Sequence, residues 1–198
     1  MIISMSGEKT KKRFDLYIIV AVGLLAALVF AASFLRILIP TPLGNTALHL
    51  GNVLCLLSGL LLGGLNGGLA AGFGSFFFDL VYPGYAESAP YTLVFKFCLA
   101  LVCGLIAYAG GRRGEKAGFN ILGAIAGSLT YVVLYLGKSF LFDIWFARTE
   151  VATAWADVTA KGIVSIANAV IACVVAVPLA FVIRKAVSHT AIYKRVMK

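Results

Sequence analysis

Charged side chains are scarce in this sequence, since aspartate, glutamate, lysine and arginine make up 13% of the residues and hydrophobic residues make up 61%. A soluble domain of 198 residues has too few polar groups here to cover its apolar surface, whereas a lipid bilayer removes the need to cover it. The composition therefore excludes an ordinary soluble enzyme and predicts an integral membrane protein.

The motifs of common catalytic sites are also missing. The sequence contains no metalloprotease helix motif, no nucleophile elbow, no phosphate-binding glycine loop and only two histidines. The four cysteines, Cys55, Cys98, Cys103 and Cys173, lie within apolar stretches and lack the spacing of metal ligands, so we expect free core thiols. We therefore expect no enzyme, no cofactor and no metal site, and the energy for any transport must come from a partner or an ion gradient.

Long apolar stretches dominate what is present. A membrane-spanning helix needs about 20 apolar residues to cross roughly 30 Å of hydrocarbon. By that measure the sequence predicts six spans, at 16–38, 46–63, 67–82, 90–110, 118–142 and 161–183. The fold class that follows is an all-α integral membrane protein, a compact bundle of six transmembrane helices.

The connections between the predicted spans have their own signals. Two prolines and a glycine predict an outer loop at 39–44, and the longest outer loop, in part helical and amphipathic, is expected at 143–160. The first span resembles a signal peptide, with its basic start and the small residues Ala31 and Ala32, but its apolar stretch is too long for one. We expect an uncleaved helix there.

Basic residues show the orientation. Of the 17 lysines and arginines, 12 fall in three segments that six spans place on one side of the membrane: before the first span, between spans four and five, and from Arg184 onward. The positive-inside rule then predicts that both termini are cytoplasmic, with an N-terminal segment at 1–14, a transmembrane substrate-binding domain at 15–185 and a basic tail at 186–198. Because the formal charge of +9 is accounted for by topology, we expect the lipid bilayer, and not nucleic acid, as the partner of these charges.

Small residues recur every four positions in three spans. They are Gly23, Ala27 and Ala31 in the first, Gly64, Gly68 and Gly72 in the third, and Gly123 and Gly127 in the fifth. Small residues at this spacing let helices approach closely in lipid. We expect the second and third groups to pack inside this bundle, and the first to dock another subunit.

Polar side chains gather toward the predicted outer side, and they come from five spans. Asn45, His49 and Asn52 have the spacing of one helical face in the second span. The remaining candidates are Asp79, Tyr82, Tyr85, Glu87, Tyr91, Lys96, Lys138, Asp143 and Asn168. Polar groups in lipid are costly and usually face a cavity or one another, so the cluster predicts a pocket for a small polar molecule with a flat ring.

Each member of the cluster has a structural alternative. Lys96 with Asp79, and Lys138 with Asp143, can neutralise one another as ion pairs. His49 by itself is more typical of a hydrogen-bonded core histidine than of a metal ligand, and Tyr91 also suits the aromatic belt of a membrane protein. For Glu87, in a loop, a role in the pocket and a place in the loop without a binding role are equally favoured.

The chain resembles the substrate-binding S components of energy-coupling factor (ECF) vitamin transporters, over essentially its whole length. The likeness is carried by the six short spans, the Gly23/Ala27/Ala31 stripe, the stretch from Gly44 to Asn52, and the glycine-rich segment from Gly63 to Asp79. Family members carry an Ala-xxx-Ala stripe in the first span, which Ala27 and Ala31 match.

The resemblance implies a multi-pass cell-membrane protein that binds a vitamin from outside with high affinity. It then delivers the vitamin inward when docked on a transmembrane coupling subunit and two ATPases, which handle ATP. Within the family, the span-two segment resembles that of members associated with riboflavin, hydroxymethylpyrimidine and vitamin B6 uptake. We lean to a vitamin B6 vitamer or hydroxymethylpyrimidine, with riboflavin next.

Other classes remain open. A six-span secondary carrier would use Asp79 or Asp143 for proton coupling and would transport by itself. A non-transporting scaffold would use the polar cluster for packing alone. A membrane enzyme is the least favoured class, since no nucleophile–base or metal set can be assembled.

Overall fold

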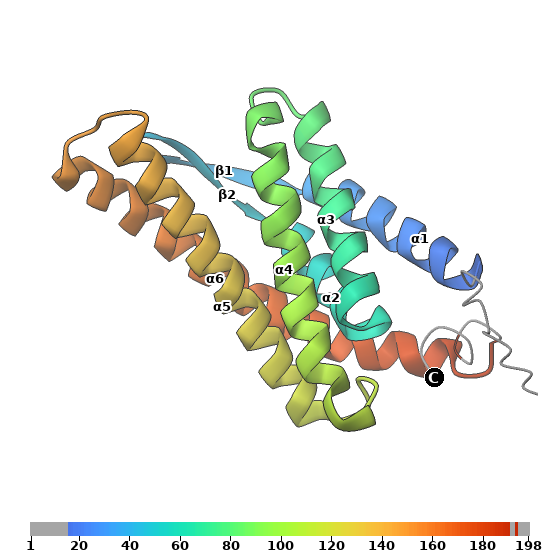
Figure 1. Ribbon diagram of the computed structural model, residues 1–198. Coiled ribbons are helices and arrows are strands. Elements are labelled where there is room, and N and C mark those ends of the chain that lie inside the picture. Colours follow the sequence, from blue (N-terminus) through green and yellow to red (C-terminus); the bar gives the residue numbers. More distant parts are fainter. Residues whose placement is uncertain (1–15, 191–192, 194–198) are drawn as a thin grey trace, which may run out of the picture.

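Six α-helices and one β-hairpin make up the described part of the chain, residues 16–190 and 193 of a computed structural model (Figure 1). The helices are α1 (Leu16–Ser33), α2 (Gly51–Leu62), α3 (Gly64–Val81), α4 (Ala89–Tyr108), α5 (Ala117–Trp145) and α6 (Val151–Val187). The strands are β1 (Arg36–Thr41) and β2 (Gly44–His49), and short 3-10 turns η1 (Ala86–Ser88) and η2 (Ala109–Gly111) flank α4. The predicted helical membrane fold is confirmed. The predicted segment 1–14 and most of the tail 186–198 lie outside the described residues.

Four of these helices are long and apolar enough to cross a membrane: α1, α4 with its flanking turns, α5 and α6. The helix α2 has only 12 residues, which corresponds to about 18 Å at 1.5 Å per residue. Nearly all of α2 is buried, and α1, α3, α4 and α6 pack around it. The predicted second span at 46–63 is therefore too long, and α2 forms the centre of the bundle.

A β-hairpin occupies residues 36–49, where we expected the end of the first span, a loop and the start of the second span. The helix α1 ends at Ser33, whose hydroxyl donates to the Val29 carbonyl at 2.8 Å. The strands pair antiparallel from Arg36 opposite His49 to Thr41 opposite Gly44. A glycine at φ 146° beside the turn suits a hairpin, and the pairing of its strands satisfies backbone groups that an irregular loop would leave open.

The connection between α5 and α6 is shorter than predicted. The expected loop at 143–160 is largely helical, because α5 continues to Trp145 and α6 already begins at Val151; helix within this segment was expected, but the loop was placed too long. Asp157 and Lys161 are one helical turn apart in α6 and form an ion pair at 2.5 Å. This pairing lets two charged residues continue a helix where their charge suggested a loop.

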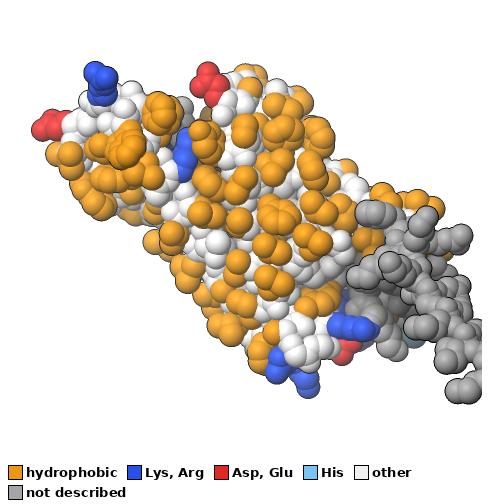
Figure 2. Space-filling view, in the orientation of Figure 1, with side chains coloured by type: hydrophobic (Ala, Val, Ile, Leu, Met, Phe, Trp, Pro, Cys, Tyr) orange, Lys and Arg blue, Asp and Glu red, His pale blue; other side chains and the backbone are white. Residues whose placement is uncertain are grey.

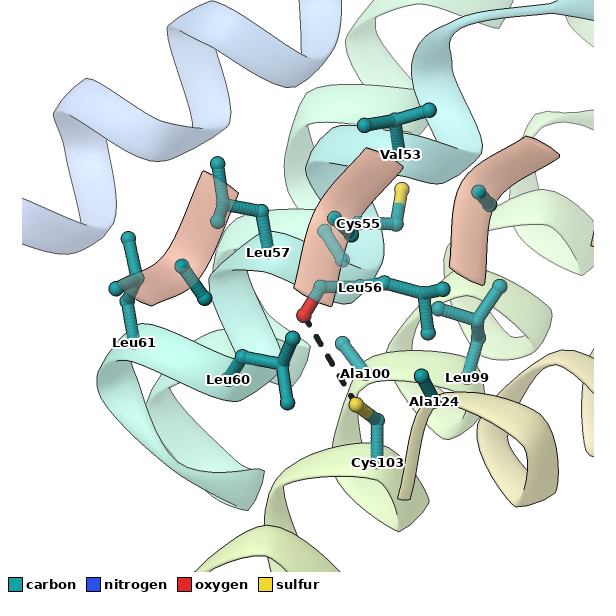
Figure 3. Packing of buried hydrophobic residues seen from close by; sticks show 14 of the residues in the cluster. Val53, Cys55, Leu56, Leu57, Leu60, Leu61, Leu99, Ala100, Cys103 and Ala124 are labelled. Carbon is teal, nitrogen blue, oxygen red and sulfur yellow. Dashed lines mark hydrogen bonds between the residues drawn. The ribbon is translucent and has the colours of Figure 1, made fainter. Parts of the chain in front are cut away.

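The core is built where α2 meets α4 and α5 (Figure 3). Leu56 and Leu60 of α2 are fully buried and lie beside Leu99 and Cys103 of α4. The Cys103 thiol donates weakly to the Leu56 carbonyl at 3.9 Å. All four cysteines are free, and Cys55 and Cys103 are buried, as expected for core thiols.

Glycines set the spacing between α3, α4 and α5. A Cβ added at Gly127 would lie 2.4 Å from the Leu99 carbonyl oxygen, and one at Gly123 would lie 2.5 Å from that of Cys103. At Gly68, an added Cβ would lie 2.9 Å from the Phe97 ring. The prediction that these two glycine groups pack within the bundle is confirmed.

The surface over α3, α4 and α5 is largely apolar, with charged side chains gathered toward its two ends (Figure 2). This is the pattern expected of a body surrounded by lipid. The prediction that both termini are cytoplasmic remains a prediction. One part of its basis changes: Arg184 lies within α6 and is buried, so it is not part of a free basic tail.

Candidate substrate-binding pocket

A pocket lies between the β-hairpin and one end of the helical bundle. Its wall comes from the end of α1, both strands, α3, the η1 segment, α4, α5 and α6. Eight of the twelve predicted residues line it: Asn45, His49, Asp79, Tyr85, Tyr91, Lys96, Lys138 and Asn168. The structure thus brings together side chains that are up to 123 positions apart in the sequence, Asn45 and Asn168 being the most distant pair.

Asn45 and His49 face the pocket for a reason different from the predicted one. They lie on β2, so the helical spacing with Asn52 does not hold. Alternate residues of a strand share a face, so positions four apart also point to the same side. The prediction of a shared helical face was wrong, although the two side chains do lie together.

Four predicted residues lie outside the pocket lining. Asn52 is buried in α2, and its side-chain Oδ1 accepts a hydrogen bond from the Nζ of the lining residue Lys96. Tyr82 follows α3 and packs its ring on Tyr85 at 5.3 Å. Glu87 is exposed in η1, and Asp143 is buried near the C-terminal end of α5 without lining the cavity.

The hairpin is held against the bundle by polar contacts. Asn168 of α6 accepts a hydrogen bond from the His49 backbone N–H at 2.9 Å and donates to the Ala47 carbonyl at 2.7 Å. Asp157 accepts from the Leu43 N–H at 3.0 Å, beside the turn. Tyr135 donates to the Thr46 hydroxyl at 3.3 Å. These bonds place the hairpin over the pocket. Both polar side-chain atoms of Asn168 form hydrogen bonds with backbone groups of the hairpin.

Lys96 enters the pocket from α4 and is only 3% exposed. Its ammonium donates to Asn52 and lies 3.8 Å from the centre of the Tyr131 ring. The Tyr131 and Tyr135 rings are nearly parallel, at 5°, with centres 5.8 Å apart. A cation and two aligned rings on adjoining walls form a surface suited to a flat ligand.

Arg36 is a pocket residue that sequence reasoning missed as a site residue. Its guanidinium lies over the rings of Tyr85 at 4.5 Å, Tyr82 at 4.7 Å and Phe78 at 5.3 Å. The first predicted span, 16–38, includes Arg36 near its end, and only the hairpin register directs this side chain into the pocket. The other polar lining residues that were missed are Ser33, Thr46, Ser75, Ser88, Thr92, Tyr131, Tyr135 and Ser165.

His49 lies opposite Arg36 in the hairpin register. Burial lowers the pKa of His49 well below its usual 6.5, and the positive charges of Lys96 and Arg36 lower it further. The imidazole is therefore neutral at pH 7. Its buried Nδ1 has no hydrogen-bond partner among the described residues, so it is available to a ligand.

The ion pairs we considered as alternatives do not form at contact distance. Within residues 16–190 and 193, the single ion pair within 4 Å joins Asp157 and Lys161. Lys138 instead lies over the rings of Tyr91 at 5.0 Å and Phe142 at 4.9 Å. The described side chains also contain no group of three histidine, cysteine, aspartate or glutamate residues that could hold a metal ion.

The sequence as a whole matches a known family. The model of the family described as the ECF-type riboflavin transporter S component matches residues 13–185 of this chain. The chain belongs to this family. As an S component it is a membrane-embedded binding subunit of a vitamin transporter and not an enzyme, as the sequence analysis expected.

A curated relative adds little about the S component's activity. It is a Pyrococcus woesei protein described as an uncharacterised protein in the gap 3' region, 29% identical over 103 residues. The match covers 52% of the S component and 66% of the relative, slightly under two thirds of its length. Substrate and partners must be argued from the pocket and the surface.

Proposed function

We propose that this S component binds riboflavin, or a flat heteroaromatic vitamin of the same kind, in the pocket beneath the hairpin. The family description favours riboflavin over the vitamin B6 vitamers and hydroxymethylpyrimidine that the sequence analysis placed first. The observation that carries the proposal is the joint lining of the pocket by aromatic rings and hydrogen-bonding groups from several elements. Aromatic faces bind a flat ring by stacking, while amide, imidazole and charged groups bind its polar edge.

The roles of individual residues follow from whether their side chains line the cavity or are hydrogen-bonded to other parts of the protein. Asn45, His49, Asp79, Lys96 and Lys138 line the cavity, and we assign them to direct contact with the vitamin. Tyr85 and Tyr91 supply ring faces on the wall formed by η1 and the start of α4. Asn168 and Asn52 act by positioning, since the first holds the hairpin and the second holds Lys96.

Ligand binding by the purified protein tests the proposal. The intrinsic fluorescence of riboflavin should be quenched on binding, because its ring stacks against tyrosines, and bound ligand should raise the apparent melting temperature. Pyridoxine and hydroxymethylpyrimidine serve as comparison ligands. Quenching and stabilisation by riboflavin alone support the proposal. If pyridoxine or hydroxymethylpyrimidine stabilises the protein and riboflavin does not, the result favours the ligands that the sequence analysis placed first.

Delivery across the membrane requires partners in this proposal. The chain has no phosphate-binding motif, so we assign ATP hydrolysis to two ATPases and contact with them to a transmembrane coupling subunit. The competing secondary carrier would transport by itself. Uptake of riboflavin into vesicles containing only this chain, abolished by an uncoupler, would favour the carrier, whereas binding without uptake favours the S component.

A further inference from the structure

The electrostatics of the pocket bear on which form of the vitamin it receives, an inference that rests on the proposed function. We propose that the ligand presents an anionic group, a carboxylate or a phosphate, to the part of the pocket formed by Arg36, His49 and Lys96. These three side chains are called the basic corner below.

The hairpin register assembles the basic corner. Arg36 and His49 are directly opposite each other in the β1–β2 pair, so their side chains emerge on the same face. Both line the cavity, as does Lys96 from α4. The three groups therefore converge from two elements on one space.

The corner carries more positive charge than its surroundings neutralise. Asp79 is the one carboxylate among the cavity-lining residues, and it faces both Arg36 and Lys96. Neither cation has a carboxylate within 4 Å in the described part of the chain. Lys138 belongs to a separate group with Lys161, Asp143 and Asp157, where two cations balance two carboxylates. The basic corner thus retains an excess of one positive charge.

Hydrogen-bond donors in the corner are also unfilled. The buried Nε of Arg36 has no acceptor among the described residues, and its guanidinium is held over three aromatic rings that accept no conventional hydrogen bond. Lys96 has Asn52 as its hydrogen-bond acceptor and can donate two more bonds. A cation away from water is costly unless it is paired. An anionic ligand group that pairs with these cations therefore binds more favourably than a neutral group.

Two matched pairs of ligands test the proposal on the purified full-length protein: riboflavin with riboflavin 5'-phosphate, and pyridoxine with pyridoxine 5'-phosphate. Titration calorimetry measures each dissociation constant. We expect the anionic member of at least one pair to bind about tenfold more tightly, the difference between charge-assisted and neutral hydrogen bonds. Equal or tighter binding of the neutral member in both pairs would overturn the anionic ligand and leave the proposed vitamin binding intact. No binding of any of the four would overturn both.

Variants connect the preference to the corner. Arg36→Gln and, as a second substitution in case the first disturbs the hairpin, Lys96→Gln should bring the affinity ratio of the anionic to the neutral member close to one. Arg148→Gln removes the same charge from an exposed position between α5 and α6 and should leave the ratio unchanged. Two results would refute the assignment of the anionic group to the basic corner. One is an affinity ratio that stays the same in both Arg36→Gln and Lys96→Gln, and the other is a ratio that falls as much in Arg148→Gln as in the corner variants.

Discussion

Single polar residues hold together parts of this protein that apolar packing alone would leave loosely connected. Asn168 ties α6 to β2 through two backbone hydrogen bonds. At the opposite end of the bundle Arg184 donates to the Leu60 carbonyl at 2.6 Å and to the Tyr108 hydroxyl at 2.9 Å. Its positive charge lies at the C-terminal end of α2, where the helix dipole favours a cation. In both cases a side chain supplies the partner that a buried backbone group needs.

Replacing Asn168 by leucine keeps the approximate side-chain size and removes both bonds to the hairpin. We expect a loss of about 2 kcal/mol or more in the free energy of unfolding, because a backbone N–H and a carbonyl lose their partners. Vitamin affinity should fall with it, since Asn45 and His49 lie on the released strand. Thermal unfolding and titration measure the two effects. Thr159→Val, at an exposed site on the same helix, is the control, and equal stability of the two variants would contradict the prediction.

Tyr108→Phe tests the contacts at the end of α2. The tyrosine hydroxyl donates to the Leu61 carbonyl at 2.6 Å and accepts from Arg184, so its removal leaves both buried groups short of a partner. A destabilisation of about 1–3 kcal/mol is expected. The half-buried Tyr193 provides the comparison, because its hydroxyl makes an exposed hydrogen bond to Glu115 at 3.5 Å: Tyr193→Phe should change stability by less than about 0.5 kcal/mol. A melting temperature for Tyr108→Phe as high as that of Tyr193→Phe would show that the Tyr108 hydroxyl does not stabilise the end of α2.

At the level of elements, close approach of helices and the placement of the hairpin depend on different residues. The helices α3 and α5 contact α4 through glycines, and α2 lies enclosed among its neighbours because it is short, largely apolar and free of charged residues. The hairpin depends on polar contacts with α5 and α6. The bundle can thus remain stable while the hairpin, which carries part of the pocket, responds to single polar substitutions.

Two glycines of α5 allow a matched test of the packing. Gly127→Ala would place a methyl group 2.4 Å from the Leu99 carbonyl oxygen, so we expect it to destabilise the protein by about 1–3 kcal/mol. A Cβ at the exposed Gly137 meets nothing within 4 Å, and alanine should there be neutral or stabilising by up to about 1 kcal/mol, because it favours the helix. Thermal unfolding of both variants in the same detergent measures the two changes in stability. Equal melting temperatures would show that α5 does not approach α4 closely at Gly127.

At the level of the whole molecule, α1 differs from the other candidate spans. Only 17% of its apolar window is buried, against 28% to 33% for the others. Leu25, Val29 and Ser33 face the bundle, while Gly23, Ala27 and Ala31 are all exposed. A stripe of small residues that is exposed among the described residues, 16–190 and 193, is the geometry we propose for docking on the coupling subunit.

Ala27→Trp should therefore separate binding from transport. We expect unchanged vitamin affinity in the isolated protein, because α1 contributes to the pocket only near Ser33. ATP-dependent uptake in vesicles that also contain the coupling subunit and ATPases should be lost. The matched variant Leu24→Trp is also exposed on α1 but outside the stripe, and it should retain uptake. Uptake by both variants would remove the stripe from the interface.

The orientation of the molecule is testable with a membrane-impermeant maleimide. Glu87→Cys in η1 is exposed on the pocket side, and Lys116→Cys is exposed near the start of α5. If the termini are cytoplasmic, Glu87→Cys is labelled in intact cells and Lys116→Cys only after permeabilisation. The wild-type protein, whose cysteines lie in helices, sets the background. The reverse labelling pattern would mean that the pocket opens to the cytoplasm.

Much of this protein could be predicted from its composition and periodicity. The membrane class, the six helices and the packing of the glycines in α3 and α5 follow from local properties, since apolar length and small-residue spacing act within one helix or between neighbours. Polar residues such as Lys96 and Asp79 stood out because lipid makes them costly. The family resemblance rested on the same features.

What local properties could not supply was the hairpin and everything that depends on it. Whether residues 36–49 continue a helix or pair as strands is decided by contacts with α5 and α6, more than 80 positions away. For the same reason the place of Arg36 on a strand and that of Asp157 within α6 were not predicted. The sequence by itself determined that the chain lies in a membrane and that its polar groups need partners. Only the tertiary structure decided which partners they find, because the energy of burying a polar group depends on atoms that are distant in the chain and adjacent in space.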